Sequence, residues 1–332
     1  MKVSILMPVF NVKPYIGECL SSLDRSLCAY TGPVLSEIVI VDDASTDGSL
    51  EVVEKYAAQH DNVVIVRHDT NKGRSEARNS AMRVSSGEYI AWVDPDDKVD
   101  VEWFASIAQV LERQNPDAIA FDWKSFSADK EKVWRYGIQR FGIKDSLSGY
   151  VSATKYVMDL LHAIHAFAVP WQRVVRKCVY DGLRHVAPRD MDEDIVIAYE
   201  FLPRIKSVYY ISKTLYSYRD TRPNSSMNSR TIEGQIRKVD YFMRMMDGID
   251  AKYLPALRYL ILHTMRSTIR ESYREGAAKS VKTIAKRYRR YHRKWLLGVC
   301  MDRYVPIKRK IYICIFAFPI FKFLINSIGR VT

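Results

Sequence analysis

Short apolar segments alternate with helical segments through residues 1–125, and this alternation constrains the fold more than any other feature of the sequence. Apolar runs that favour strands cover residues 2–10, 37–41, 62–66, 89–93 and 118–121. Apolar residues recur at helical spacing over residues 15–23, 49–59, 75–84 and 102–113. A helix between consecutive strands returns the chain to the same end of the sheet, so such strands run parallel. The sequence therefore predicts an α/β fold with a doubly wound, mostly parallel sheet.

An acidic turn follows the fourth of these strands. Asp94, Asp96 and Asp97 lie within four residues, and Pro95 cannot continue a central strand. In open α/β sheets, ligands bind at the edge where the strands end, so these carboxylates should lie at a site. Carboxylates this close repel one another unless a cation joins them, and a divalent cation shared with phosphate oxygens is a suitable partner. A solvated acidic turn is the alternative.

Two residues that follow neighbouring strands extend this prediction. Asp43 can accept a hydrogen bond from the N–H of a base, and Arg78 can pair with a phosphate. The alternatives are structural, because Asp43 can simply close a turn and Arg78 can bridge two helices. The sequence has no Gly-x-Gly-x-x-Gly pattern and no Walker loop, so it supports neither a dinucleotide-binding fold nor a P-loop.

Four segments in this order resemble the successive motifs of the family 2 glycosyltransferases, which have the GT-A fold. The segments are VSILMPVFN (3–11), IVDDASTDG (40–48), NKGRSEARN (71–79) and GEYIAWVDPDD (87–97). The resemblance implies a nucleotide-sugar donor, usually a UDP-sugar, together with Mg²⁺ or Mn²⁺. It also implies that Pro8, Phe10 and Asp43 contact the base. Asp94 would contact the ribose or the metal, and Asp96 would ligate the metal. Asp97 is a further candidate ligand of the metal.

Four acidic residues gather before an apolar helix that runs to residue 202. They are Asp190, Asp192, Glu193 and Asp194. Acids in a first turn stabilise a helix through its dipole, which is the structural interpretation. The functional interpretation is a general base, because a carboxylate within hydrogen-bond reach can take the proton of an attacking hydroxyl. The Glu193-Asp194 pair resembles the Glu-Asp motif of the family, in which the Asp is the base of inverting members. Asp194 is therefore the predicted base, and Asp192 and Glu193 are its possible substitutes.

Two further segments resemble parts of related bacterial enzymes. Trp171 precedes a polar residue and a short basic strand, and its ring suits stacking on a sugar face, although it also suits an ordinary core. Arg219 and Arg222 belong to a segment similar to the loop that closes over the donor diphosphate. There they would neutralise charge on the departing nucleoside diphosphate. A solvated loop is the alternative for this segment.

The net charge of +13 belongs to the C-terminal end of the chain. Residues 279–310 hold 12 Lys or Arg and one acid, whereas residues 1–278 carry equal numbers of basic and acidic residues. Residues 281–299 form an amphipathic pattern with Tyr and Trp on the apolar side, which is typical of helices at membrane surfaces. Residues 311–328 are nearly continuously apolar, which favours an anionic membrane over nucleic acid as the partner. The interrupting Pro319 and Lys322 favour a helix pair in the interface over a crossing.

The remaining sequence features concern the compartment and the division of the chain. The five cysteines show no metal spacing and are odd in number, which predicts reduced thiols in a cytosolic protein. The first apolar run lacks the cleavage site of a signal peptide. We expect a nucleotide-sugar-binding half (1–125), an acceptor and catalytic-base half (126–228), and a helical, basic, membrane-associating region (229–332).

These observations lead to one expected activity and one alternative. The expected enzyme is an inverting, metal-dependent hexosyltransferase that moves a sugar from a UDP-sugar to a lipid-linked saccharide and forms a β-glycosidic bond. It would act in lipopolysaccharide core, O-antigen or capsule synthesis at the cytoplasmic face of a bacterial inner membrane, as a peripheral or monotopic protein. The alternative is a non-catalytic nucleotide-sugar-binding scaffold subunit of a polysaccharide assembly complex.

Overall fold

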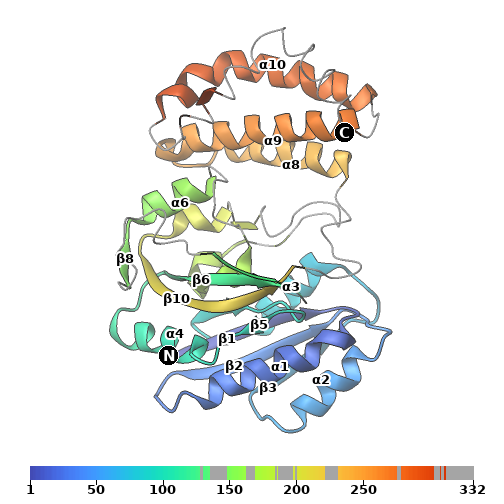
Figure 1. The fold of residues 1–332 in the computed structure, drawn as a ribbon, viewed down its shortest axis with the longest axis vertical. Helices are drawn as coiled ribbons and strands as arrows, with labels where there is room; N and C mark the ends of the chain where they lie inside the picture. Colours follow the sequence, from blue (N-terminus) through green and yellow to red (C-terminus); the bar gives the residue numbers. More distant parts are fainter. Residues whose placement is uncertain are drawn as a thin grey trace. The chain divides into compact units, whose positions relative to one another are not determined.

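The chain forms two compact units. The computed structural model describes residues 1–127, 130–134, 148–161, 169–183, 185, 197–198, 200–220, 231–274, 278–302, 307 and 310–311. Unit 1 contains residues 1–156, 167–189 and 193–228, and unit 2 contains residues 157–166, 190–192 and 229–332. Unit 1 is a β-sheet with helices, and unit 2 is built of helices (Figure 1).

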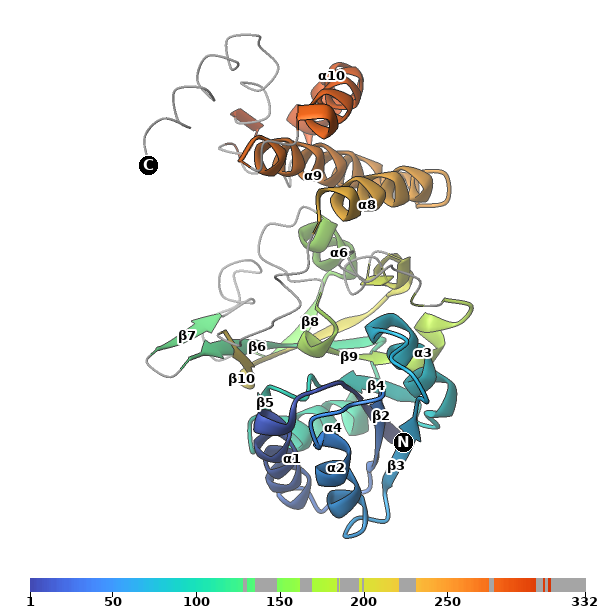
Figure 2. The ribbon, with the colours of Figure 1, turned by 90° about the vertical axis from the view of Figure 1, so that its right-hand side faces the viewer.

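The first half of unit 1 is the predicted parallel sheet. Its strands lie in the order β3-β2-β1-β4, and every neighbouring pair is parallel. Helices connect successive strands, as Figure 2 shows, so the carboxyl ends of the strands lie at one edge. The elements in chain order are β1 (Lys2–Val9), α1 (Lys13–Cys28), β2 (Leu35–Asp42), α2 (Ser49–Ala57), β3 (Val63–Arg67), α3 (Arg74–Val84) and β4 (Tyr89–Trp92).

The second half of the sheet is mixed, so the prediction of a mostly parallel sheet was wrong for this half. β9 (Arg173–Arg176) lies between β4 and β6 (Ala118–Phe126) and is antiparallel to both. The direction of β9 follows from its pairing with these two neighbours, which the local sequence pattern does not specify. Three short strands are also antiparallel to their neighbours: β5 (Lys98–Val99), β7 (Glu131–Trp134) and β8 (Gly149–Val151).

The sequence also suggests two edge strands, over residues 208–211 and 214–218, but the structure has one long strand, β10 (Val208–Arg219). β10 runs parallel to β6 and is not an edge strand, because β5 and β8 pair with its other side. The polar residues Ser212 and Lys213, which seemed to separate two strands, lie where the β6 register shifts between Ile211 and Thr214. The remaining elements of unit 1 are α4 (Trp103–Arg113), α6 (Ala153–Leu161, which continues into unit 2), η1 (Pro170–Gln172), η2 (Lys177–Tyr180) and η3 (Leu202–Arg204).

Unit 2 contains α8 (Ile232–Met245), η5 (Ala251–Tyr253), α9 (Leu254–Arg274) and α10 (Ala278–Met301). Thr231 caps α8, because its hydroxyl accepts a hydrogen bond from the Gly234 N–H at 3.0 Å. The helices α8 and α10 both pack along α9. Among the described residues, no helix is long and apolar enough to cross a membrane.

The apolar side of α10 is not the free face that the sequence suggested. Ile284, Tyr288, Trp295 and Val299 are all buried, and α10 packs against α9. The prediction that this aromatic stripe lies on a membrane was therefore wrong for these residues. A periodic apolar stripe shows that a face is buried, but it does not show whether lipid or a neighbouring helix covers it. Residues 312–328 lie outside the described part of the chain.

Candidate active site

The carboxyl ends of β1, β2 and β4 meet at one edge of the sheet. The parallel register pairs Val9 with Asp42 on β2 and Leu6 with Trp92 on β4. The backbone continues this alignment beyond the strands, because the Asp43 N–H donates to the Val9 carbonyl at 2.8 Å. Of the two residues predicted at the end of β1, Pro8 is buried and Phe10 is 43% exposed. The structure thus brings the first, second and fourth sequence motifs to one edge, as predicted.

Asp43 connects the second motif to the third. Its carboxylate accepts hydrogen bonds from the backbone N–H groups of Lys72 and Gly73, each at 2.8 Å. His68 Nδ1 lies 2.6 Å from the same carboxylate, and its Nε2 lies 2.8 Å from the Ser80 hydroxyl. Asp43 therefore closes a turn, which is one of the two alternatives given above. The predicted contact with a base remains untested, and His68 is a residue that sequence reasoning missed.

The loops after β1 and β2 are tied to each other by side chains. The Asn11 carboxamide oxygen accepts from the Thr46 N–H at 2.8 Å, and the Ser45 hydroxyl accepts from the Asn11 N–H at 3.1 Å. Asp47 accepts from the Lys13 N–H at the start of α1 and from the Ser49 N–H at the start of α2, both at 2.9 Å. Together with the Asp43 N–H bond to the Val9 carbonyl, these bonds fix the backbone on both sides of Phe10, so this exposed ring has a defined place at the sheet edge.

Arg78 and Asp94 come together, as the sequence predicted. Arg78 lies on α3, is only 1% exposed, and places Nη2 3.8 Å from Asp94 Oδ1. Its guanidinium carbon lies 5.5 Å from the centre of the Trp92 ring. A buried guanidinium needs compensating charge and polar contacts, and a carboxylate that stays partly exposed leaves room for a further anionic or cationic ligand. This pair places a positive and a negative group at the end of β4.

The three carboxylates of the acidic turn have different environments. Asp97 is 1% exposed, and its oxygens accept from the Tyr216 hydroxyl and the Arg219 N–H, both at 2.8 Å. Burial, followed by the charges of Asp96 and Asp94, raises the pKa of Asp97 well above its usual value. Asp94 and Asp96 remain partly exposed. Asp97 therefore has a structural role here, and metal ligation by Asp97 stays an untested prediction.

Asp94 and Asp96 fit a divalent cation better than Asp97 does. They offer two hard carboxylate groups separated by one residue, which suits a cation that takes its other ligands from phosphate and water. Within the part of the chain that the structure describes, no group of three or more His, Cys, Asp or Glu side chains is arranged to hold a metal.

Arg219 fastens the end of β10 to the acidic turn and to α1. Its Nε donates to the Asp96 carbonyl at 2.8 Å, and its Nη2 donates to Glu18 at 2.6 Å. Its guanidinium also lies over the rings of Tyr15 and Phe126, at 5.0 and 4.5 Å from their centres. The structure gives Arg219 a positioning role. Its predicted contact with the departing diphosphate remains untested, and Arg222 lies outside the described residues.

Trp171 belongs to an aromatic cluster that it forms with residues of β6 and β10. Its ring is 3% exposed and stacks on Tyr216 and Tyr218, with centroid distances of 4.5 and 5.6 Å. Trp123 meets it edge-on at 5.1 Å. Trp171 therefore occupies the core position that the sequence left open as an alternative, and stacking on a sugar stays an untested prediction. Tyr216 and Tyr218 are two residues apart on β10 and therefore lie on the same face of the sheet, where both meet Trp171.

His185 is a second residue that sequence reasoning missed. Its backbone N–H and carbonyl bond the Asn79 side chain at 2.8 Å each, which holds His185 beside α3. Its ring meets Trp92 edge-on at 5.7 Å and is buried, and neither ring nitrogen has a hydrogen-bond partner within the described structure. Burial, followed by the charge of Arg78, lowers the pKa of His185 to about 3. The predicted base Asp194 and its neighbours Asp192 and Glu193 lie outside the described residues.

A family model described as Glycosyl transferase family 2 matches residues 4–179, which include the four motifs from the second residue of the first motif onward, with the carboxylate turn. The chain belongs to this family. EpsJ of Bacillus subtilis, an uncharacterised glycosyltransferase, is 34% identical to this family 2 member over 67% of the chain and 62% of EpsJ. The poly(ribitol-phosphate) β-glucosyltransferase of Bacillus spizizenii is 42% identical over 31% of the chain, which spans 16% of that enzyme.

The fold of this family 2 member is similar to that of a solved enzyme. Residues 1–349 of Staphylococcus aureus TarS, in complex with UDP-GlcNAc, align with a TM-score of 0.58 over 87% of this chain and 92% of TarS 1–349. Sequence identity in that alignment is 17%, so the likeness concerns the fold. It agrees with the GT-A fold that the motifs implied.

Proposed function

We propose that this family 2 member transfers a sugar from a UDP-sugar to a hydroxyl group of a lipid-linked saccharide, with inversion to a β-glycosidic bond. The observation that carries the proposal is the edge of the sheet where Arg78 lies against Asp94 and where Asp96 stays partly exposed. Family membership and the fold shared with TarS, which was solved with UDP-GlcNAc, support a UDP-sugar as the donor.

The residues of this edge have complementary tasks in the proposal. Phe10 and the Asp43 turn would contact the base, and Arg78, which lies 3.8 Å from Asp94, would bind a phosphate oxygen. Asp94 and Asp96 would hold Mg²⁺ or Mn²⁺, and the ion would stabilise negative charge on the leaving diphosphate. Asp194 is the proposed base, which removes the proton from the acceptor hydroxyl as this oxygen attacks the anomeric carbon.

The proposed acceptor defines a place of action. Relatives of this chain include poly(ribitol-phosphate) sugar transferases, so a bacterial cell-surface polysaccharide is the proposed product class. Lipopolysaccharide core, O-antigen and capsule intermediates are specific candidates. Such intermediates are carried by lipid, and we therefore place the enzyme at the cytoplasmic face of the bacterial inner membrane.

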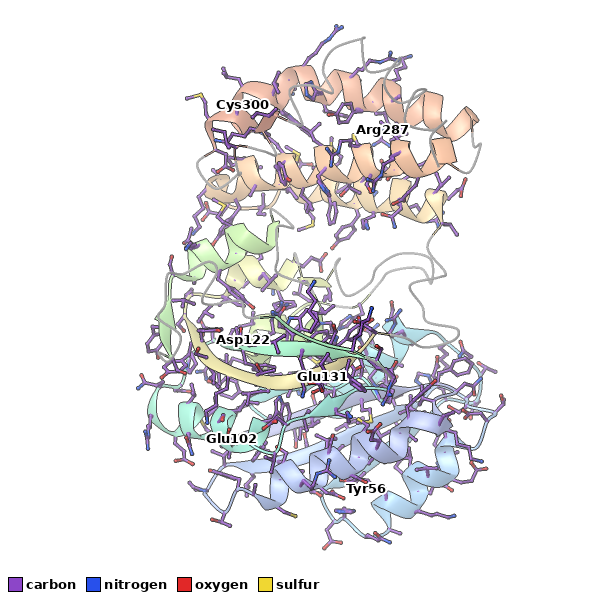
Figure 3. The ribbon with its side chains drawn as sticks, in the orientation of Figure 1. Tyr56, Glu102, Asp122, Glu131, Arg287 and Cys300 are labelled. Atoms are coloured by element: carbon purple, nitrogen blue, oxygen red, sulfur yellow. The ribbon has the colours of Figure 1, made fainter. Side chains whose placement is uncertain are left out.

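The experiment that tests this proposal measures UDP release from a panel of UDP-sugars with Mg²⁺, Mn²⁺ or EDTA. We expect slow hydrolysis of one donor that EDTA abolishes. Asp96→Ala should lose at least about 100-fold in rate, the scale on which removal of transition-state charge stabilisation acts. Glu102→Gln is the matched control, because Glu102 is an exposed acid that follows the acidic turn in the sequence and pairs with Lys213 at 2.7 Å. Figure 3 labels Glu102.

Two results would count against the proposal. An enzyme that remains fully active as Asp194→Asn would remove the assignment of the base, although the donor site would stand. Neither release nor binding of any UDP-sugar by the wild-type chain would favour the scaffold alternative. In that case the buried Arg78–Asp94 contact would have to serve the fold alone.

A further inference from the structure

The two sides of α10 differ sharply in what they contact. Its apolar side is buried against α9, so the opposite side faces away from the packed core of unit 2. The residues on this opposite side repeat at three- and four-residue spacing, which keeps them on one face of a helix. The exposed basic members are Lys286, Arg289, Arg290, Arg293 and Lys294.

No negative charge on α10 balances this face. The helix contains eight Lys or Arg and no Asp or Glu. Arg287 has an acidic partner on another helix, because it pairs with Asp240 of α8 in the same unit. Other cations lie four residues apart, as Lys286 and Arg290 do, and like charges at this spacing destabilise a helix. The arrangement costs stability within unit 2, so a negatively charged partner is a physical reason for it.

The same face becomes apolar toward the end of the helix. Leu297 and Met301 follow Arg293 at intervals of four residues, so all three lie on one stripe. Leu297 is 72% exposed and Met301 is 76% exposed. Figure 3 marks the helix with Arg287 in its middle and Cys300 near this apolar end. Cations and large apolar side chains therefore share a single exposed stripe.

This combination distinguishes between two kinds of polyanion. A dissolved polyanion, such as RNA, attracts the cations but leaves Leu297 and Met301 in water. An anionic bilayer presents phosphate groups to the cations and an acyl boundary to the apolar side chains. The observed stripe matches the second partner in both respects.

We propose that the exposed face of α10 docks unit 2 on an anionic lipid bilayer. Arg290 and Arg293 bind lipid phosphates, and Leu297 and Met301 enter the boundary between headgroups and acyl chains. The docking face is opposite to the aromatic face that the sequence indicated. The proposal gives the proposed transferase its membrane contact, yet it rests only on unit 2, so it can fail while the transferase proposal holds.

The test is flotation of the full chain with vesicles of phosphatidylcholine, with and without phosphatidylglycerol. The decisive quantity is the ratio of the two binding constants, because the apolar residues 311–328 should contribute almost equally to both. Arg290→Gln with Arg293→Gln should lower binding to the phosphatidylglycerol vesicles about 25-fold, at roughly fivefold per cation near an anionic surface. Leu297→Ser with Met301→Ser should lower binding to these vesicles as well.

The matched control is Arg237→Gln with Arg244→Gln. These residues are exposed on α8 of the same unit, and their replacement removes the same charge. Retention of binding by this control, with loss in the α10 variants, supports the proposal. Equal binding to both vesicle types, or equal loss in control and α10 variants, overturns it.

Two further measurements separate the remaining outcomes. RNA that binds as tightly as the vesicles, without any loss in the Leu297→Ser and Met301→Ser variant, would assign a dissolved polyanion and overturn the membrane proposal. UDP release measured without vesicles should be unchanged in the α10 variants, because the donor residues are in unit 1. If the wild-type chain releases no UDP but still floats with the phosphatidylglycerol vesicles, the result counts against the transferase proposal alone.

Discussion

Charge is used in opposite ways by the sheet edge of unit 1 and by α10 of unit 2. At the sheet edge, Arg78, Asp43 and Asp97 are buried, and each has specific partners. On α10, most cations are exposed, and the helix has no acidic residue. A buried charge must be held in one geometry to be tolerated, whereas an exposed charge acts mainly through the field it creates. The first arrangement suits positioning of a ligand, and the second suits attraction to a surface.

The largest effect should come from the buried cation of the sheet edge. Arg78→Met removes a buried cation that lies 3.8 Å from Asp94, and it should cost about 3 kcal/mol in the free energy of unfolding, at the lower end for a buried pair because Asp94 is partly exposed. Donor turnover should be lost with it. The matched control is Arg83→Met on the same helix, because Arg83 is exposed and its pair with Glu76 should contribute less than about 1 kcal/mol. If urea unfolding shows that both variants lose the same free energy of unfolding, buried and exposed charges do not differ in the way proposed.

The sequence predicted the parallel half of the sheet because its signals are local. Apolar runs, helical spacing and polar turns each span about ten residues or fewer, and they correctly placed β1 to β4 and the edge where Arg78 meets Asp94. The antiparallel insertion of β9 was missed, because strand direction there depends on pairing with β4 and β6 and not on local spacing. Amphipathicity likewise predicted that α10 buries a face, but it did not identify α9 as the cover.

Residue roles were harder to predict than the location of the site. Tyr216 bonds Asp97, and the two residues are 119 positions apart, so no motif around either one contains the other. The sequence allowed Asp43 either to contact a ligand or to close a turn. The turn depends on backbone N–H groups 29 and 30 residues away. Such pairings follow from the packed fold. Sequence patterns therefore identified the acids at the edge without separating structural carboxylates from those open to a ligand.

Glu37, a buried carboxylate away from the sheet edge, allows the comparison of buried with exposed charge to be tested by changing the pH. Burial alone would raise the pKa of Glu37, but hydrogen bonds from Lys2, Ser4 and Ser86 lower this pKa to about 2. Because the folded pKa lies below the ordinary value near 4.5, the stabilisation is present above pH 4.5 and is lost as the pH falls toward 2. It amounts to at most about 3 kcal/mol. Glu37→Gln should flatten the dependence of urea unfolding on pH across this window.

The matched variant for Glu37 is Glu112→Gln. Glu112 is exposed and bonds the Tyr30 hydroxyl, so its removal should leave the acid dependence nearly unchanged. If both variants keep the wild-type slope between pH 4.5 and 2, buried pairing does not determine the acid stability of unit 1.

A smaller loss is expected from a hydroxyl that supports the acidic turn. Tyr216→Phe leaves Asp97 and the Asp94 N–H without the partner they share, at 2.8 and 3.0 Å, and should cost about 1–3 kcal/mol. Tyr210→Phe is a control on the same strand, because it removes a buried hydroxyl that bonds Asp122 at 2.7 Å. Both variants should lose stability, but only Tyr216→Phe should raise the metal concentration needed for UDP release. Equal metal dependence would show that the turn does not need this support.

The smallest effects should occur on α10, where charge is exposed. Arg287→Met breaks the pair with Asp240, and since both side chains are partly exposed, the loss should be below about 1 kcal/mol. Arg290→Met on the same helix should leave thermal stability unchanged or raise it slightly, because it relieves repulsion from Lys286 and Lys294. Thermal melts at low and high salt measure both effects, and salt should reduce the difference between the two variants. A large loss in Arg290→Met would mean that this cation holds unit 2 together, and the exposed face would then not be free for a membrane.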